Sequence, residues 1–172
     1  SLSQAHITNS GTMDIYGTYS SYYITNNSGG VMNVKSGGLY SCQACAQTFS
    51  AGSTINNDGT LYFGGGGNAG TINNNAGGMI TDGVGGAQLA NSGTINNAGT
   101  FTSRSSSTTG LFNNMGTFTM PISCNFSVNS GGSFSNTGSL TVPSGSIFNV
   151  NVSGTLTNNS AGTIVNNGTF AV

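Results

Sequence analysis

The chain has 172 residues, of which 29 are glycine, and only 3% of its residues carry a formal charge. Two basic residues, Lys35 and Arg104, are too few to neutralise a row of phosphates, which excludes nucleic acid as a partner. The same shortage argues against anionic membrane surfaces, and no apolar run is long enough to span a bilayer.

Regularly spaced apolar residues favour a folded β-protein. Gly and Asn are poor helix formers, and no window of the sequence shows a sustained 3.6-residue apolar period. Disordered chains are usually highly charged and poor in aromatic and β-branched residues, whereas this chain is almost uncharged and carries such residues throughout. We therefore expect an all-β fold.

The apolar centres follow one another along the chain, mostly six to eight residues apart. They are Ile7, Met13, Tyr19, Ile24, Val31, Leu39, Phe49, Ile55, Leu61, Ile72, Met79, Ile95, Phe101, Phe112, Phe118, Phe126, Phe134, Leu140, Ile147, Leu156, Ile164 and Phe170. Each interval accommodates a strand of three or four residues and a tight corner, and Gly and Asn supply the corners because they tolerate positive φ.

A longer period is superimposed on the short one. Ile55 and Ile72 are 17 residues apart, which fits one coil of three short faces. The pattern predicts a single domain over residues 1–172, a parallel β-solenoid of about seven to eight three-sided coils. We expect an inward ladder formed by Ile55, Leu61, Ile72, Ile95, Phe101, Phe112, Phe118, Ile164 and Phe170.

Paired asparagines recur at the corners. We interpret them as an amide ladder running from coil to coil through Asn56, Asn73, Asn96, Asn113 and Asn166. Glycosylation is the alternative, because five N-x-Ser/Thr triplets begin at Asn26, Asn125, Asn151, Asn158 and Asn167.

Three segments interrupt the repeat. Residues 64–69 are a glycine run with one Asn, and residues 83–90 and 103–109 are small and polar. We expect all three to project from the rod as loops.

The chain has three cysteines: Cys42 and Cys45 in a C-x-x-C, and Cys124 far along the sequence. With His6 they provide four zinc ligands on paper, but no second C-x-x-C exists, so we expect no metal site. A disulfide is favoured instead, either Cys42–Cys45 or one of these to Cys124, with the third thiol free or linked to a neighbouring molecule.

The residues that usually carry catalysis are scattered. Asp14, Asp58 and Asp82 stand alone, which disfavours paired-carboxylate hydrolysis, and His6 lies in the terminal repeat, where nothing suggests a cleft. The glycine run lacks the lysine of a phosphate-binding loop. We expect neither an enzyme nor a bound cofactor.

Triplets with an apolar residue between two hydroxyl residues recur, as in Thr100-Phe101-Thr102, Thr117-Phe118-Thr119 and Thr155-Leu156-Thr157. Strand alternation turns the hydroxyl residues outward, so stacked triplets would form a flat Thr/Ser face. They resemble the triplets of solenoidal ice-binding proteins. On that resemblance Thr100, Thr117 and Thr155 are expected on one side.

The repeats of the form G-T-I-x-N-x-G-T-F, such as residues 93–101, are similar to β-solenoid regions of secreted bacterial and archaeal surface proteins, including adhesin-like passenger domains and fibre or sheath subunits. The resemblance implies a structural or adhesive role outside the cell. Because the first and last coils of a solenoid expose unpaired backbone groups, we expect identical subunits to stack end to end into a filament or sheath. An adhesin that binds a surface or glycan and an ice-binding protein are the alternatives.

Overall fold

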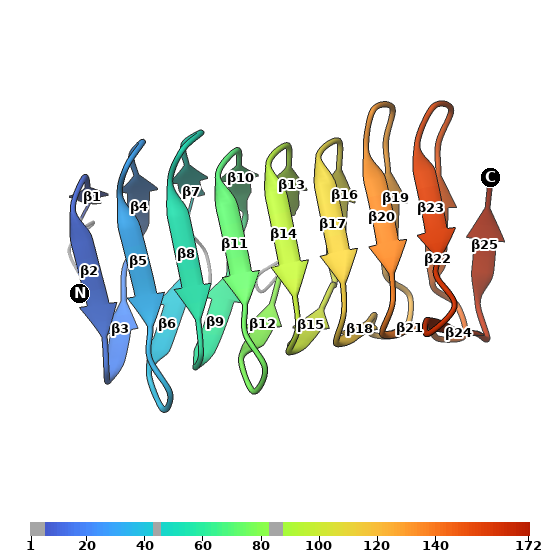
Figure 1. Cartoon of the computed structure of the whole chain (residues 1–172), viewed down its shortest axis with the longest axis horizontal. Coiled ribbons are helices and arrows are strands. Elements are labelled where there is room, and N and C mark those ends of the chain that lie inside the picture. The colour runs from blue at the N-terminus through green and yellow to red at the C-terminus, as the bar shows by residue number, and fades with distance from the viewer. Residues whose placement is uncertain (1–5, 43–45, 83–87) are drawn as a thin grey trace.

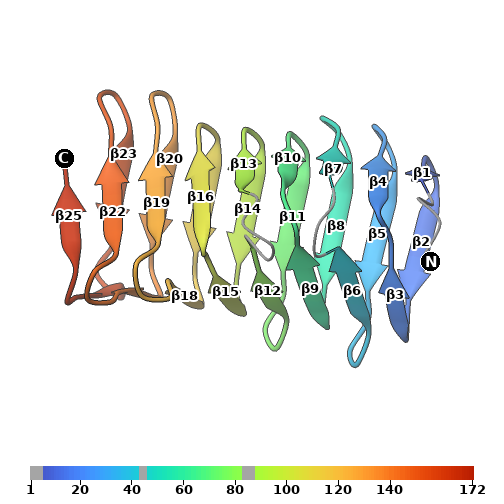
Figure 2. The same ribbon diagram turned by 180° about the vertical axis from the view of Figure 1, so that it is seen from behind.

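The computed structural model describes residues 6–42, 46–82 and 88–172. Within these ranges it contains 25 strands of three or four residues and no helix, drawn as successive rungs in Figures 1 and 2. In chain order they are β1 (His6–Asn9), β2 (Thr12–Ile15), β3 (Thr18–Ser20), β4 (Tyr23–Asn26), β5 (Val31–Val34), β6 (Leu39–Cys42), β7 (Ala46–Phe49), β8 (Thr54–Asn57), β9 (Thr60–Phe63), β10 (Gly66–Asn68), β11 (Thr71–Asn74), β12 (Met79–Thr81), β13 (Leu89–Asn91), β14 (Thr94–Asn97), β15 (Thr100–Thr102), β16 (Ser105–Thr108), β17 (Leu111–Asn114), β18 (Thr117–Thr119), β19 (Asn125–Val128), β20 (Ser133–Asn136), β21 (Ser139–Val142), β22 (Ile147–Val150), β23 (Thr155–Asn158), β24 (Thr163–Asn166) and β25 (Thr169–Ala171).

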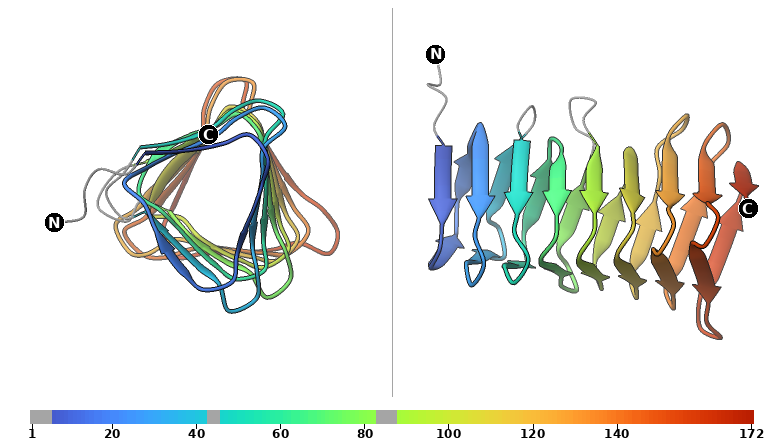
Figure 3. Two further views of the ribbon diagram at one scale, coloured as in Figure 1. Left: turned by 90° about the vertical axis from the view of Figure 1, so that its left-hand side faces the viewer. Right: turned by 90° about the horizontal axis from the view of Figure 1, so that it is seen from above.

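Every third strand joins the same sheet, and the strand pairings are parallel. Sheet A has nine strands, from β1 to β25; sheet B has eight, from β2 to β23; and sheet C has eight, from β3 to β24. The chain therefore makes eight turns and adds one further strand, and Figure 3 shows the three-sided cross-section. The predicted all-β parallel β-solenoid with three-sided coils is confirmed.

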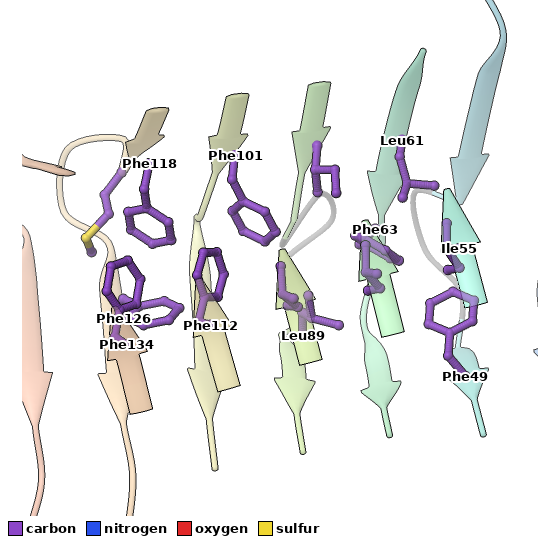
Figure 4. Close-up of a cluster of buried hydrophobic side chains, with 14 of the residues drawn as sticks. Phe49, Ile55, Leu61, Phe63, Leu89, Phe101, Phe112, Phe118, Phe126 and Phe134 are labelled. Carbon is purple, nitrogen blue, oxygen red and sulfur yellow. The ribbon is translucent and has the colours of Figure 1, made fainter. Parts of the chain in front are cut away.

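Inward side chains from all three sheets fill the space between the sheets (Figure 4), and each sheet contributes a column of stacked apolar residues to it. Sheet B stacks Ile55, Ile72, Ile95 and Phe112, and sheet C stacks Leu61, Ile80, Phe101 and Phe118, all with at most 1% of their surface exposed. Aromatic rings continue this packing: the Phe101 and Phe118 rings stack 5.7 Å apart and the Phe112 and Phe134 rings 4.8 Å apart. Each buried side chain of this size stabilises the fold by about 1.5–3 kcal/mol.

Wherever two apolar residues are adjacent, the structure decides which of them is the core residue. The sequence pattern predicts Val31, Leu39, Met79 and Ile147 as the core residues, but the buried residues are the ones that follow them, Met32, Tyr40, Ile80 and Phe148. The reason is register: Met32 pairs with Ile55 and Ile80 with Leu61, so a shift by one residue would turn a whole strand inside out.

The expectation that residues 64–69, 83–90 and 103–109 project as loops is wrong for the nine of them that lie in strands. Gly66–Asn68 forms β10, Leu89–Asn91 forms β13 and Ser105–Thr108 forms β16, all in sheet A. Residues 83–87 lie outside the described part of the chain. The middle of the inward column of sheet A therefore contains Gln47, Gly66 and Ser106 where the other columns hold large apolar residues.

Glycines line the corners because the coils approach one another closely there. At the corner between sheets B and C, a Cβ added to Gly99 would lie 2.2 Å from the carbonyl oxygen of Gly78, and one added to Gly116 would lie 2.2 Å from that of Gly99. Side chains are excluded by these contacts, which lie far inside van der Waals distance.

In the described residues no helix has the length and hydropathy to cross a membrane.

Candidate functional surfaces

Two amide ladders run along the solenoid, one on its surface and one inside. The outer ladder lies on sheet B, where Asn73 donates to Asn56 and Asn96 donates to Asn73, each at 2.9 Å. Asn113 extends it at one end, and Asn33 and Asp14 extend it at the other. Four of the five asparagines predicted to form a ladder therefore belong to it.

The fifth asparagine, Asn166, lies elsewhere. It belongs to β24 of sheet C, pairs with Val142, and its Oδ1 accepts a hydrogen bond from the Gly168 N–H. The structure therefore separates Asn166 from the sheet B ladder, because the last Asn-Asn pair of the sequence has moved to a different corner of the coil.

The inner ladder was missed as a separate feature. It consists of the asparagines that end six consecutive strands of sheet B, at the corner between sheets B and C: Asn57, Asn74, Asn97, Asn114, Asn136 and Asn158. From Asn57 to Asn136, each Nδ2 donates to the Oδ1 of the next member at 2.7–2.8 Å, and all members but Asn158 are at most 1% exposed. The sequence carries this signal for Asn57, Asn74, Asn97 and Asn114, which repeat with the same period as the asparagines before them, whereas Asn136 has no neighbouring asparagine.

A shorter stretch of the same kind occupies the corner between sheets A and B. There Asn9 donates to Asn26 at 2.8 Å, and Asn68 donates to Asn91 at 2.7 Å. The direction is the same as in the inner ladder, from each coil to the next one along the chain. Asn26 is completely buried, so this folded structure leaves no room for a glycan on it.

The predicted hydroxyl face is realised only in part. Thr100 pairs with Thr117, and Thr117 with Ser139, while Thr102, Thr119 and Thr141 form a parallel column, all on sheet C. Thr155 is in β23 of sheet B and does not lie with them, so the expectation of one side carrying Thr100, Thr117 and Thr155 is wrong. The face comprises β15, β18 and β21, and Met79, Tyr62 and Val165 interrupt it on either side.

The two end faces of the described solenoid leave core residues half-covered. Ile7, Met13 and Tyr19 occupy inward positions in the first coil, and Leu156, Ile164 and Phe170 do so in the last coil. All six pack against the core on one side only, which makes them partly exposed. Ile164 and Phe170 are thus inward-facing but not enclosed like the rest of the predicted ladder. A hollow of about 300 Å³ lined by residues 13–19 lies at the first coil.

Two corner glycines of the first coil differ from their counterparts. Gly38, which follows Gly17 in the corner between sheets B and C, has the Ile15 carbonyl oxygen 2.3 Å from an added Cβ. At Gly17 and Gly11 an added Cβ would meet nothing within 4 Å. Within the described residues these two positions have no steric reason to be glycine.

The three cysteines have different environments. Cys42 is buried and disulfide-bonded, whereas Cys124 is a half-buried free thiol whose pKa is raised by burial. Cys45 lies outside the described residues. Among the residues that the structure describes, no group of three His, Cys, Asp or Glu side chains is positioned to hold a metal.

The three aspartates are in three different settings. At the surface, the Oδ1 of Asp14 accepts a hydrogen bond from the Asn33 amide and lies 3.4 Å from the Lys35 Nζ. The hydrogen bond from Asn33 is the main cause that lowers the pKa of Asp14. Asp58 is an exposed corner residue that accepts from Asn75. Asp82 is completely buried. The structure does not bring them together.

Asp82 is the most unusual polar residue of the core. Burial raises the pKa of its carboxyl group to about 6, although the carboxylate accepts hydrogen bonds from the Ser106 and Ser103 hydroxyls and from the Arg104 N–H. These donors come from the next coil, so Asp82 ties two adjacent coils at the corner between sheets C and A. Its role is one of holding that corner.

The chain matches no protein-family model, no curated protein sequence and no solved structure.

Proposed function

We propose that the protein is a structural subunit of an extracellular filament or sheath whose copies stack end to end. The observation that carries the proposal is the open space at Gly11 and Gly17. At Gly38, Gly59, Gly78, Gly99, Gly116, Gly138 and Gly162, the later glycines of the same corner as Gly17, a carbonyl oxygen lies 2.1–2.4 Å from an added Cβ. The first-coil glycines acquire the same steric role when another coil is placed on that face.

The end faces supply the surfaces for such stacking. Among the described residues, β1, β2 and β3 are the edge strands at one end and β23, β24 and β25 at the other, and the free N–H and C=O groups of such edges accept a further strand readily. The partly exposed apolar side chains of the first coil would pack against those of the last, as they do between neighbouring coils inside the solenoid. With a formal net charge of −1, little electrostatic repulsion opposes the approach of a second copy.

The cysteine chemistry supports a place outside the cytosol. Disulfides persist in oxidising compartments and are rare among cytosolic proteins, and Cys42 is disulfide-bonded. A solenoid with few charged groups and a disulfide bond fits a secreted structural subunit better than an intracellular one.

The proposal is tested by Gly17→Ala. Because nothing lies within 4 Å of the added methyl group, the variant should fold with an unchanged melting temperature, but its Cβ should clash with a carbonyl oxygen of a stacked neighbour. We expect filaments from the unmodified chain and soluble monomers from the variant, measured by analytical ultracentrifugation and negative-stain microscopy. Gly67→Ala is the matched control, since it also has nothing within 4 Å but lies mid-rod in β10.

Two results would count against stacking. The first is a chain that stays monomeric at high concentration, which would leave the two end faces to other segments of a longer protein or to a different partner. The second is a Gly17→Ala variant that forms filaments as readily as the Gly67→Ala control.

Ice binding is a second candidate function, favoured by one observation. Thr100, Thr117 and Ser139 form one outward column, and Thr102, Thr119 and Thr141 form another, two residues along the same three strands. Ordered hydroxyl rows of this kind, about 4.8 Å apart across strands, can hold a layer of water in register with a crystal face. Thermal hysteresis that disappears in Thr119→Tyr would support it, and unchanged ice growth at millimolar protein would dismiss it.

A further inference from the structure

The number of strands restricts how one solenoid can continue another. Each turn of the chain rises by one strand spacing, because β22 pairs with β25 after one complete circuit. Sheet A has nine strands, whereas sheets B and C have eight. The C-terminal end of the described solenoid is therefore not flat. Along the solenoid axis, β25 extends beyond β23 and β24, as Figure 1 shows at its red end.

A second copy placed without rotation does not fit this end. If β1 of the next copy paired with β25, its β2 would lie two strand spacings above β23, and its β3 two spacings above β24. Sheets B and C would each lack one strand at the junction, a gap of roughly 4.8 Å that leaves backbone groups unpaired.

We propose that each subunit is rotated by one face relative to the one before, so that β1 pairs with β23, β2 with β24 and β3 with β25. This inference rests on the proposed end-to-end assembly and assigns its geometry. All three sheets then continue without a missing strand, sheet A of one copy following sheet B of the other. A heterologous contact of this kind repeats into an open helical filament, here with about one third of a turn per subunit.

The residues that meet in this arrangement match. Continuing the register of β20 and β23 places Ile7 on Leu156 and Thr8 on Thr157. Continuing sheet C places Met13 on Ile164 and Thr12 on Thr163. At these positions apolar residues fall on apolar residues and threonines on threonines, as they do between coils inside the molecule. The last two residues of β2 differ, since Asp14 would lie on Val165 and Ile15 on Asn166.

The inner amide ladder also continues across the rotated junction. Asn158 is its last member; its Oδ1 accepts from Asn136 and its Nδ2 donates to the Gly162 carbonyl, with a second N–H left over. In the rotated arrangement the next residue of the column is Asn9, which already donates forward to Asn26. Without rotation the column position above Asn158 is Ile15, which has no acceptor to offer.

Aromatic and glycine columns agree with the same rotation. Tyr19 would stack on Phe170, repeating the stacked pairs Tyr19–Tyr40 at 6.0 Å and Phe148–Phe170 at 5.0 Å within the chain. Gly11 would lie at the corner of Gly162, and Gly17 at that of Gly168, so glycine falls on glycine at both corners.

Engineered cysteine pairs distinguish the two arrangements. In a Cys124→Ser background, Thr8→Cys with Thr157→Cys joins outward positions that the rotated stack places one strand spacing apart, within disulfide reach. Thr8→Cys with Ala171→Cys does the same for the unrotated stack, since Ala171 holds the outward position of β25 that corresponds to Thr8 of β1. Thr8→Cys alone is the control for non-specific oxidation.

We expect copper-phenanthroline oxidation to give a ladder of covalent multimers on non-reducing gels with the Thr157 pair and none with the Ala171 pair. A ladder with the Ala171 pair alone, or filaments that cross-link with neither pair, would overturn the rotation and leave end-to-end assembly intact. Absence of filaments and of both ladders would overturn the assembly itself.

Discussion

The two amide ladders place the same side chain in two environments at adjacent positions, which makes Asn96→Ala and Asn97→Ala a matched pair. Asn97 donates to the Asn114 Oδ1 at 2.7 Å and to the Thr117 carbonyl at 3.0 Å, and it accepts from Asn74 at 2.7 Å. Asn96 donates to Asn73 and accepts from Asn113, both at 2.9 Å, but it is only half-buried.

The expected losses of stability differ several-fold. Each hydrogen bond contributes about 1 kcal/mol net, and a buried acceptor left without a donor costs about 1–3 kcal/mol more. Truncating Asn97 removes three bonds and leaves the Asn114 oxygen unpaired in the core, so we expect a loss of about 4–6 kcal/mol. At Asn96 water replaces the lost partners, and we expect a loss below about 1 kcal/mol.

Urea unfolding followed by far-UV circular dichroism measures both losses from the shift in midpoint at constant m-value. If the m-value falls, the array is unfolding coil by coil, and amide hydrogen exchange around β14 then reports the local loss. Equal losses for Asn96→Ala and Asn97→Ala, or a near-neutral Asn97→Ala, would refute the claim that the buried hydrogen bonds of the inner ladder stabilise the fold more than those of the outer ladder.

Three further outcomes follow from the core and its corners. Because the pKa of buried Asp82 is raised to about 6, the folded state holds its proton more tightly than the unfolded state. The contribution of Asp82 to stability should therefore be complete below about pH 4 and fall by roughly 3 kcal/mol as pH rises through 6. Asp82→Asn should abolish this fall, and an unchanged pH profile in urea titrations would contradict the assignment. Alkylation of the native protein without reductant should label Cys124 and leave Cys42 unmodified, and mass spectrometry that finds Cys42 labelled would disprove the disulfide. Gly99→Ala should lower the melting temperature sharply because its Cβ would lie 2.2 Å from a carbonyl oxygen, whereas Gly67→Ala should leave it nearly unchanged, and similar thermal scans for the two would show that coil spacing is looser than described.

The fold was predictable because its repeat is short and apolar residues alternate with polar ones. Ile55 and Ile72, at a separation of 17 residues, already indicated which strands stack. The prediction of core residues was wrong where two apolar residues are adjacent, such as Met79 and Ile80, because the sequence alone does not show which of the two points into the core.

Segments of poor strand propensity were the other source of error. Ser105–Thr108 and Gly66–Asn68 have few features of a strand, yet both are held in sheet A by hydrogen bonds to strands on either side. In a solenoid the neighbouring coils impose the backbone conformation, so tertiary context overrides local preference.

The candidate surfaces were harder to predict than the core. Stacking determines which outward residues become neighbours, and variable corners shift that assignment: Thr155 repeats the triplet of Thr100 but lies on a different sheet. The inner and outer amide ladders are likewise distinguishable only once each asparagine of a pair is assigned to a strand face or a corner.

The most direct test of end-to-end assembly is helical reconstruction by cryo-electron microscopy of the native protein. With 25 strands in the described part of each subunit, three to a coil, we expect filaments with an axial rise of about 40 Å per subunit and three continuous β-ladders running through every junction. Single solenoids that remain separate at high concentration, or filaments whose ladders stop between subunits, would contradict the proposal.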